Sequence, residues 1–233
     1  MGKAKPLFKG HYQPKVPADL GYYDLRVPET RREQAELARQ YGIEGFCYWH
    51  YWFGNGRQLL QRPFQEVLAS GEPDFPFCLA WANHSWEDKQ FNKEGGNKML
   101  MEQLYPGDED YIAHFNAVLP AFKDPRYIRV NGEPLFMIYA PMKVPDIAHF
   151  IELWQKLAEP HGFRIHFVGH TSKTEELPLF RQWGFNATNL VRLFDVFQKN
   201  YSLLGRIKTK FQRITFHPVS YTHLRAHETC ADL

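Results

Sequence analysis

The feature that most constrains the fold of this chain is the alternation of amphipathic helical patterns with short apolar segments. Each apolar segment has the length of a strand and is bounded by glycine, proline or polar residues. Continuous apolar runs of this length are typical of parallel strands that are buried on both faces. We expect five such strands, over residues 42–52, 75–83, 134–139, 163–169 and 185–193.

The segments between these strands have the 3.6-residue apolar period of helices. Several of them begin at a capping residue or a proline, and several end at a glycine. We expect helices over residues 30–41, 63–70, 108–122, 145–157 and 174–183, and a hairpin-type turn at Asn131-Gly132. Strands that alternate with helices form parallel βα units. We therefore predict an α/β fold, an incomplete (β/α)8 barrel of the TIM type with about five parallel strands present.

Composition excludes several classes of function. The chain has 233 residues, of which 44% are hydrophobic and 23% charged, which is typical of a globular protein with one substantial domain. A net charge of +2 with interspersed signs predicts no nucleic-acid partner. No apolar run is long enough to cross a bilayer, so we expect no transmembrane segment.

The three cysteines, Cys47, Cys78 and Cys230, are widely spaced, and two of them fall within expected strands. This usage is typical of small buried hydrophobic residues in a reducing compartment. We therefore predict a cytoplasmic protein, and action at the inner face of the membrane through partners stays open.

Aromatic, imidazole and amide side chains stand where the expected strands end. Because the carboxyl ends of parallel strands open onto the ligand crevice, we expect these side chains to share one rim. An aromatic wall with a few hydrogen-bonding groups suits a sugar ring, although the same tryptophans also suit core packing. The residues that we expect to bind substrate are His11, Tyr23, His50, Trp52, Trp81, Asn83, Trp86, Gln103, Tyr139 and His170.

Other aromatic and histidine residues lie on expected helices. His114 and His149 are expected to be packing or surface residues, and Trp154 is expected in the core. His50, His84 and His170 come from the ends of separate strands, and their spacing matches no metal-ligand motif, so we predict no metal site.

Seven ordered motifs along the chain carry a family resemblance. They are Gly-His-Tyr-Gln-Pro at 10–14, Leu-Gly-Tyr-Tyr-Asp-Leu-Arg at 20–26, Tyr-Gly-Ile-Glu-Gly-Phe-Cys-Tyr-Trp-His-Tyr-Trp-Phe at 41–53, Trp-Ala-Asn at 81–83, Glu-Gln-Leu-Tyr at 102–105, Phe-Lys-Asp-Pro-Arg-Tyr-Ile at 122–128 and Gly-Glu-Pro-Leu-Phe at 132–136. Over residues 5–200 the chain resembles the WbsX family, glycoside hydrolase family 99-like proteins encoded with bacterial surface-polysaccharide genes.

This resemblance implies a barrel of the hydrolase 99 type. It also implies glycosyltransferase activity in the biosynthesis of O-antigen, lipopolysaccharide and related surface polysaccharides. An endo-acting glycoside hydrolase and a non-catalytic glycan-binding module are the alternatives. A saccharide or glycan is the expected substrate, and a nucleotide-sugar donor stays open because no glycine-rich phosphate cradle is present. We expect no cofactor.

Chemistry at a glycosidic bond needs a carboxylate near the anomeric carbon and usually a second acid or base opposite it. Many family members have a glutamate after Trp-Ala-Asn, and this chain has His84 at that position. The weak candidates for catalysis are His84, Glu87 and Asp24. Of these, His84 could act as an acid or base near neutral pH.

The family resemblance also bears on domain organisation. Members usually begin with a further strand and a loop reading Gly-Phe-Thr-Glu-Trp, and they continue through further strands. We therefore expect residues 1–217 to be a barrel fragment that is truncated at both ends and inactive alone, with the catalytic carboxylates in the missing segments. Residues 218–233 resemble a translated sequencing adapter, and we expect a non-native tail there.

Overall fold

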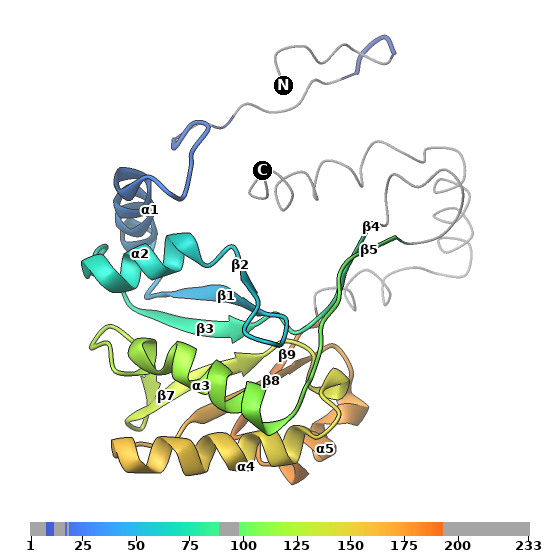
Figure 1. The fold of residues 1–233 in the computed structure, drawn as a ribbon. Coiled ribbons are helices and arrows are strands. Elements are labelled where there is room, and N and C mark those ends of the chain that lie inside the picture. The colour runs from blue at the N-terminus through green and yellow to red at the C-terminus, as the bar shows by residue number, and fades with distance from the viewer. Residues whose placement is uncertain (1–7, 12–16, 18, 89–97, 193–233) are drawn as a thin grey trace. The chain divides into compact units, whose positions relative to one another are not determined.

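The structure is a computed structural model that describes residues 8–11, 17, 19–88 and 98–192 (Figure 1). The chain divides into two compact units, one of residues 1–34 with 193–233 and one of residues 35–192. The expected tail at 218–233 lies outside the described residues. Helix α1 (Pro28–Gln40) begins two residues before the expected Thr30, because proline fits the first turn of a helix without losing a hydrogen bond.

Five parallel strands form the main sheet of the second unit. They are β1 (Phe46–Trp52), β3 (Phe77–Trp81), β7 (Glu133–Ile138), β8 (His166–Thr171) and β9 (Ala187–Leu190). They neighbour one another in this order, and each neighbouring pair is parallel. All five expected strands are confirmed, and the described sheet is open rather than closed into a barrel.

Short antiparallel strands extend this framework. β2 (Gln58–Leu59) pairs with β1, and β6 (Arg129–Val130) pairs with β7. The predicted turn joins β6 to β7, with φ of 53° at Asn131 and 85° at Gly132, a conformation that asparagine and glycine tolerate. β4 (Trp86–Asp88) and β5 (Lys98–Met101) form a separate two-stranded sheet that the sequence pattern did not indicate.

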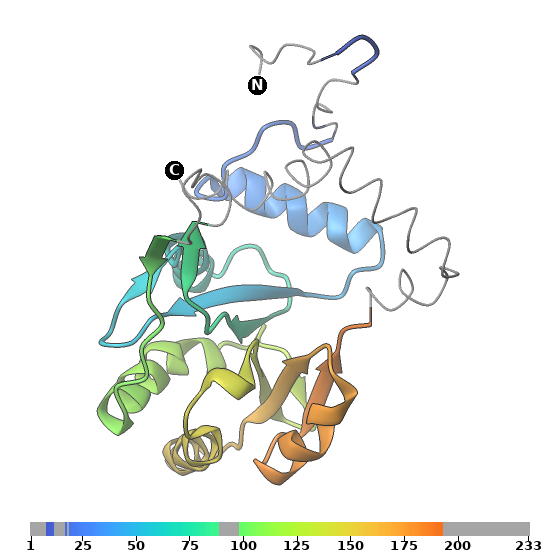
Figure 2. The same ribbon diagram turned by 90° about the vertical axis from the view of Figure 1, so that its right-hand side faces the viewer.

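Helices α2 to α5 pack on one face of the main sheet. They are α2 (Arg62–Ser70), α3 (Asp108–Phe122), α4 (Ile147–Ala158) and α5 (Leu177–Gln182), with single turns η1 (Pro141–Lys143), η2 (Glu159–His161) and η3 (Thr174–Glu176) between elements. In Figure 2 the green, yellow and orange helices lie on one side of the strands. The expected helices are confirmed within a few residues at their ends.

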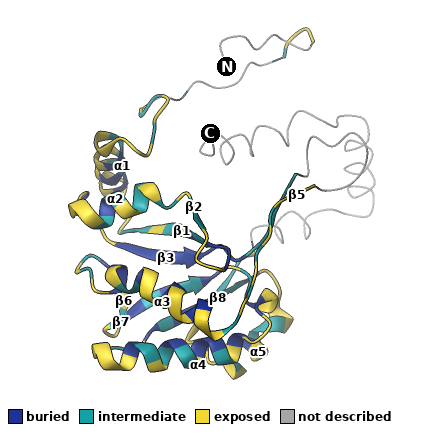
Figure 3. Ribbon diagram, in the orientation of Figure 1, coloured by how far each residue is buried: buried dark blue, intermediate teal, exposed yellow. Residues whose placement is uncertain are grey.

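Strand register separates the side chains of the sheet into two faces. Leu79, Phe136 and Phe167 occupy one row of in-register partners, and all three are buried beneath the helices. The alternating row of register partners faces the other way and holds Trp49, Ala80, Met137, Val168 and Ala187. We call these the helix face and the Trp49 face. Figure 3 shows that β3 is buried, whereas the outer sides of the helices are exposed.

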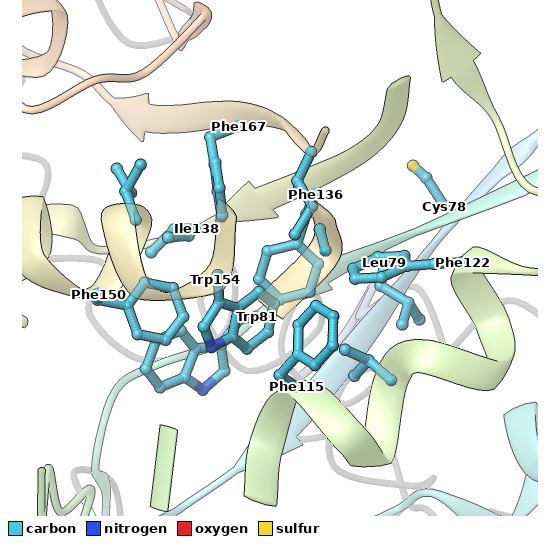
Figure 4. Close-up of a cluster of buried hydrophobic side chains, with 14 of the residues drawn as sticks. Cys78, Leu79, Trp81, Phe115, Phe122, Phe136, Ile138, Phe150, Trp154 and Phe167 are labelled. Atoms are coloured by element: carbon cyan, nitrogen blue, oxygen red, sulfur yellow. The ribbon is translucent and has the colours of Figure 1, made fainter. Parts of the chain in front are cut away.

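The core lies between the helix face and the helices, and it is dominated by aromatic rings (Figure 4). Trp154 of α4 stands at its centre, 4.6 Å from Phe150 and 4.9 Å from Phe136 between ring centroids. Gly169 of β8 leaves room for Phe180 of α5, since a Cβ there would meet that ring at 2.6 Å. Trp154 is therefore a core residue, as expected.

The two described cysteines lie on the Trp49 face, where Cys47 and Cys78 are register partners. Cys78 is buried, but Cys47 is exposed, so the expectation that both are buried hydrophobic residues is wrong for Cys47. The reason is position, because Cys47 lies on the outer parallel strand β1 and Cys78 on the inner strand β3.

Candidate functional site

Three rings, from β1, β8 and the residue after β7, form a row on the Trp49 face near the carboxyl ends of the strands, with β3 between β1 and β7. Trp49 of β1 meets the ring of Tyr139 edge to face, with centroids 5.4 Å apart. Tyr139, directly after β7, stacks on His170 of β8 at 4.9 Å and 23°. Trp49 is 50% exposed and Tyr139 36% exposed, so both rings keep accessible surface. We call Trp49, Tyr139 and His170 the ring row.

Asn189 of β9 orients the imidazole at the end of the ring row. Its Nδ2 donates to Nδ1 of His170 at 3.2 Å and lies 3.9 Å from the sulfur of Met137. Because an amide nitrogen only donates, Nδ1 must accept, and the neutral ring carries its proton on Nε2. Partial burial lowers the pKa of His170, which favours this neutral form. His170 therefore presents an N–H donor on its other nitrogen.

His84 joins the ring row from the segment after β3. Its ring centroid lies 5.2 Å from that of Tyr139, and its backbone N–H donates to Ala82 O. This arrangement brings three of the sequence-predicted residues together, namely His84, Tyr139 and His170. The role of His84 as an acid or base stays a prediction.

Asn83 is fully buried, so the expectation that it contacts sugar hydroxyls is wrong. Its Oδ1 accepts from the Ala140 N–H at 2.7 Å, and its Nδ2 donates to Ala140 O at 2.9 Å and to the Tyr105 hydroxyl at 3.1 Å. These bonds use both amide protons and one acceptor site of the amide oxygen within the protein. Asn83 instead ties the end of β3 to the backbone next to Tyr139 and so positions the ring row.

His50, Trp52 and Trp81 point to the helix face, and their predicted contact with substrate is also wrong. Trp52 is 3% exposed and Trp81 1% exposed. Trp52 Nε1 donates to Asp110 Oδ2 at 2.9 Å, and Trp81 Nε1 donates to Trp52 O at 3.0 Å. Both indoles therefore have core partners and leave no ring surface for a sugar.

Behind the sheet, His50 pairs with His114 of α3, their Nε2 atoms 2.9 Å apart. His114 stacks on Trp52 with centroids 4.8 Å apart, so it is a packing residue, as expected. Burial lowers the pKa of His50 to about 4 and that of His114 well below its usual range.

The alternation of side chains along a strand explains why His50 and Trp52 were wrongly predicted to bind substrate and why Trp49 was left out. Residues two apart share a face, whereas neighbours oppose each other. His50 and Trp52 therefore face the helices, and Trp49 faces the opposite way. Trp49 is the residue that sequence reasoning missed, and strict period-two counting along residues 46–52 would have found it.

Trp86 begins β4, and Gln103 follows β5 by two residues. Trp86 packs edge to face against Tyr51 and Phe53, at 5.2 Å in each case. The Gln103 backbone N–H donates to Ser85 Oγ at 3.0 Å, and its side chain Nε2 donates to Leu104 O at 3.0 Å. Glu87 lies in β4 and is half-buried. Substrate binding by Trp86 and Gln103 and catalysis by Glu87 stay predictions.

The remaining predicted residues belong to the first unit. His11 stacks on Phe8 with centroids 4.9 Å apart, and Tyr23 is exposed. Asp24 forms an ion pair with Arg26 at 2.5 Å. Their proposed roles stay predictions.

A surface groove of about 910 Å³ lies at the opposite ends of the strands. Its lining includes Gly132 and Glu133 at the start of β7, Arg164 before β8 and Gly184 before β9. In parallel sheets ligands bind at the carboxyl ends, so the ring row rather than this groove is the candidate site.

The described residues hold neither a metal-ligand cluster nor a membrane-spanning helix. No group of three or more histidine, cysteine or acidic side chains there could hold a metal ion. None of the helices in the described part of the chain is both long and apolar enough to span a bilayer.

Comparison with known proteins identifies a family for this chain. The sequence model described as "Glycosyltransferase WbsX" matches residues 1–228. The chain is 36% identical over 189 residues to the "Uncharacterized protein WxcX" of two strains of Xanthomonas campestris pv. campestris. The match covers 80% of this chain, which spans 26% of the length of these relatives.

Among solved structures, the GH99 endo-alpha-mannosidase from Bacteroides thetaiotaomicron has a similar fold. Its TM-score is 0.52 at 15% sequence identity, and the alignment covers 79% of this chain and 53% of the mannosidase. The likeness supports the predicted α/β barrel architecture, present here as an incomplete barrel.

Proposed function

Because the chain belongs to the WbsX glycosyltransferase family, we propose that it forms the saccharide-binding part of a glycosyltransferase that builds bacterial surface polysaccharide. O-antigen and lipopolysaccharide are the expected products. The expected partners are a glycan acceptor and a nucleotide-sugar donor. We place this reaction in the cytoplasm, at the inner face of the membrane.

The ring row is the single observation that supports saccharide binding most. A sugar has apolar C–H faces and hydroxyl edges, so it suits an aromatic wall with hydrogen-bonding groups beside it. Trp49 offers a half-exposed indole, and Tyr139 a partly exposed phenol. The free Nε2–H of the His170 tautomer fixed by Asn189 would donate to a hydroxyl.

The roles follow from this chemistry. We propose that Trp49 stacks on a sugar face, that Tyr139 and His170 contact hydroxyls, and that His84 stands nearest to the reacting bond. Glycosyl transfer still needs a carboxylate. We assign that group to Glu87 or Asp24, or to the additional length that the curated relatives have.

Incubation of the full-length gene product with nucleotide-sugars and lipid-linked acceptors tests this proposal. Donor-dependent elongation of the acceptor, weakened by Trp49→Ala, is the expected result. Release of reducing ends from a polysaccharide without any donor would instead identify an endo-acting hydrolase. Saccharide binding without turnover, unaffected by replacing Glu87 and Asp24 with alanine, would identify a glycan-binding module.

A further inference from the structure

Cys47 and Cys78 lie side by side across two neighbouring parallel strands. They are register partners in β1 and β3, so their side chains project from the same face of the sheet. Neighbouring strands are about 4.8 Å apart, and a disulfide spans Cα separations of about 4.4–6.8 Å. The backbone therefore already holds the two residues at a separation that a disulfide can bridge.

The two thiols differ in accessibility and in acidity. Cys47 is exposed, and Cys78 is buried. A hydrogen bond from the Cys78 thiol lowers the pKa of Cys47. The same hydrogen bond raises the pKa of Cys78, and burial raises it further. The accessible sulfur is thus the one that ionises first, and the thiolate is the nucleophile in disulfide exchange.

We propose that Cys47 and Cys78 form a cross-strand dithiol that small-molecule disulfides, such as glutathione disulfide, oxidise to an intramolecular disulfide. The Cys47 thiolate attacks one sulfur of glutathione disulfide, breaks its S–S bond and releases one glutathione thiolate. This leaves a mixed disulfide at Cys47. Cys78 then loses its proton and attacks Cys47 Sγ, and the second glutathione leaves.

The reaction balances without a further reagent. The two protein thiols lose two electrons and two protons and become one disulfide, and one glutathione disulfide becomes two glutathione thiols. The new bond would join β1 to β3 two residues before Trp49, on the same face. This inference does not depend on the proposed saccharide function.

The test uses the full chain with Cys230→Ser, so that Cys47 and Cys78 are the only cysteines. The protein is treated with glutathione disulfide, quenched in acid and measured by intact mass, free-thiol titration and peptide mapping. We expect loss of both thiols, a mass decrease of two hydrogens and a linked pair of peptides. Reduction should restore both thiols.

A matched control moves one thiol by two residues on the same face and strand. In Cys78→Ala with Ala80→Cys, the two thiols are diagonal neighbours about 7–8 Å apart, which is too far for easy closure. This variant should retain glutathione adducts. Cys78→Ala alone should stop at a single adduct on Cys47, which serves as the comparison if circular dichroism shows that the shifted variant is unfolded.

Two results would overturn the proposal. One is a stable glutathione adduct on Cys47 in the parent protein, with Cys78 still a free thiol. The other is linkage of the shifted pair at the same rate as the native pair.

Discussion

Tyr139 stacks on His170 across the boundary between β7 and β8, with ring centroids 4.9 Å apart. On its other side the Tyr139 ring meets Trp49, so the rings of three strands are continuous at the carboxyl end of the sheet. Trp49 lies in β1, His170 in β8, and Tyr139 directly after β7, so the strand register sets their alignment. The predictions below test this alignment, the residues that hold it and the core behind it.

Replacing His170 with alanine should weaken saccharide binding with little loss of stability. The change removes the Nε2–H donor and the ring that stacks on Tyr139. We expect the saccharide affinity to fall roughly tenfold, which corresponds to about 1.4 kcal/mol. Calorimetric titration with short oligosaccharides from bacterial surface polysaccharides measures it. His149→Ala is the matched control, because His149 is exposed on α4 and bonds Asp108. Equal affinities of the two variants would contradict a role for His170.

Asn83→Ala should destabilise the protein and also weaken saccharide binding. The substitution leaves the part-buried N–H of Ala140 without its acceptor, which costs up to about 1–3 kcal/mol. It also releases the backbone beside Tyr139, so both the midpoint of urea unfolding and the saccharide affinity should fall. If binding falls while the unfolding midpoint stays unchanged, Asn83 contacts the ligand directly and is not a positioning residue.

Trp81→Ala should lower the free energy of unfolding by about 3–5 kcal/mol, the usual cost of truncating a large buried aromatic residue. Trp49→Ala should cost far less, because half of that side chain is already exposed. Chemical denaturation of both variants measures the difference. A larger loss of unfolding free energy for Trp49→Ala than for Trp81→Ala would contradict the assignment of Trp81 to the buried helix face.

Stability should fall as the pH is lowered from about 6.5 towards 4. His50 and His114 are neutral in the fold because burial lowers the pKa of each, to about 4 for His50, whereas the unfolded chain binds protons near the ordinary value of 6.5. The unfolded state therefore binds more protons in this window, and the stabilisation present above pH 6.5 is lost as pH falls. For His50 the loss is roughly 3 kcal/mol.

Thermal melts between pH 7 and pH 4.5 measure this effect. Other groups around the pair are Trp52, Trp81 and Trp154, which do not titrate, and Asp110, which accepts from Trp52. His50→Gln should flatten the dependence. The exposed His149, whose pKa Asp108 raises, contributes with the opposite sign, so His149→Ala should leave the slope of the wild type or steepen it. An unchanged slope in His50→Gln would contradict the assignment.

The architecture was predictable from sequence because each parallel strand is an apolar run between two segments with a helical pattern. The runs that became β1, β3, β7, β8 and β9 were all found, and glycines and prolines marked many of the boundaries. The β4–β5 sheet was not found, because its pairing depends on tertiary contacts rather than on a local pattern.

The site was only partly predictable. Tyr139 and His170 follow from their place at strand ends, but β1 carries aromatic or imidazole side chains at Tyr48, Trp49, His50, Tyr51 and Trp52, so residue type alone could not choose a face. The prediction that Asn83 contacts sugar hydroxyls failed for a different reason. An amide suited to bidentate contacts with a ligand is equally suited to the backbone of a neighbouring strand, and burial decides between them.

The most direct measurement compares two tryptophans that are three residues apart on opposite faces. Saccharide affinity is determined by calorimetry for Trp49→Ala and for Trp52→Phe, a conservative change that removes the Nε1 bond to Asp110. Our account predicts a loss of about tenfold for Trp49→Ala, or about 1.4 kcal/mol, and an unchanged affinity for Trp52→Phe. Full affinity in Trp49→Ala together with a loss in Trp52→Phe would contradict it.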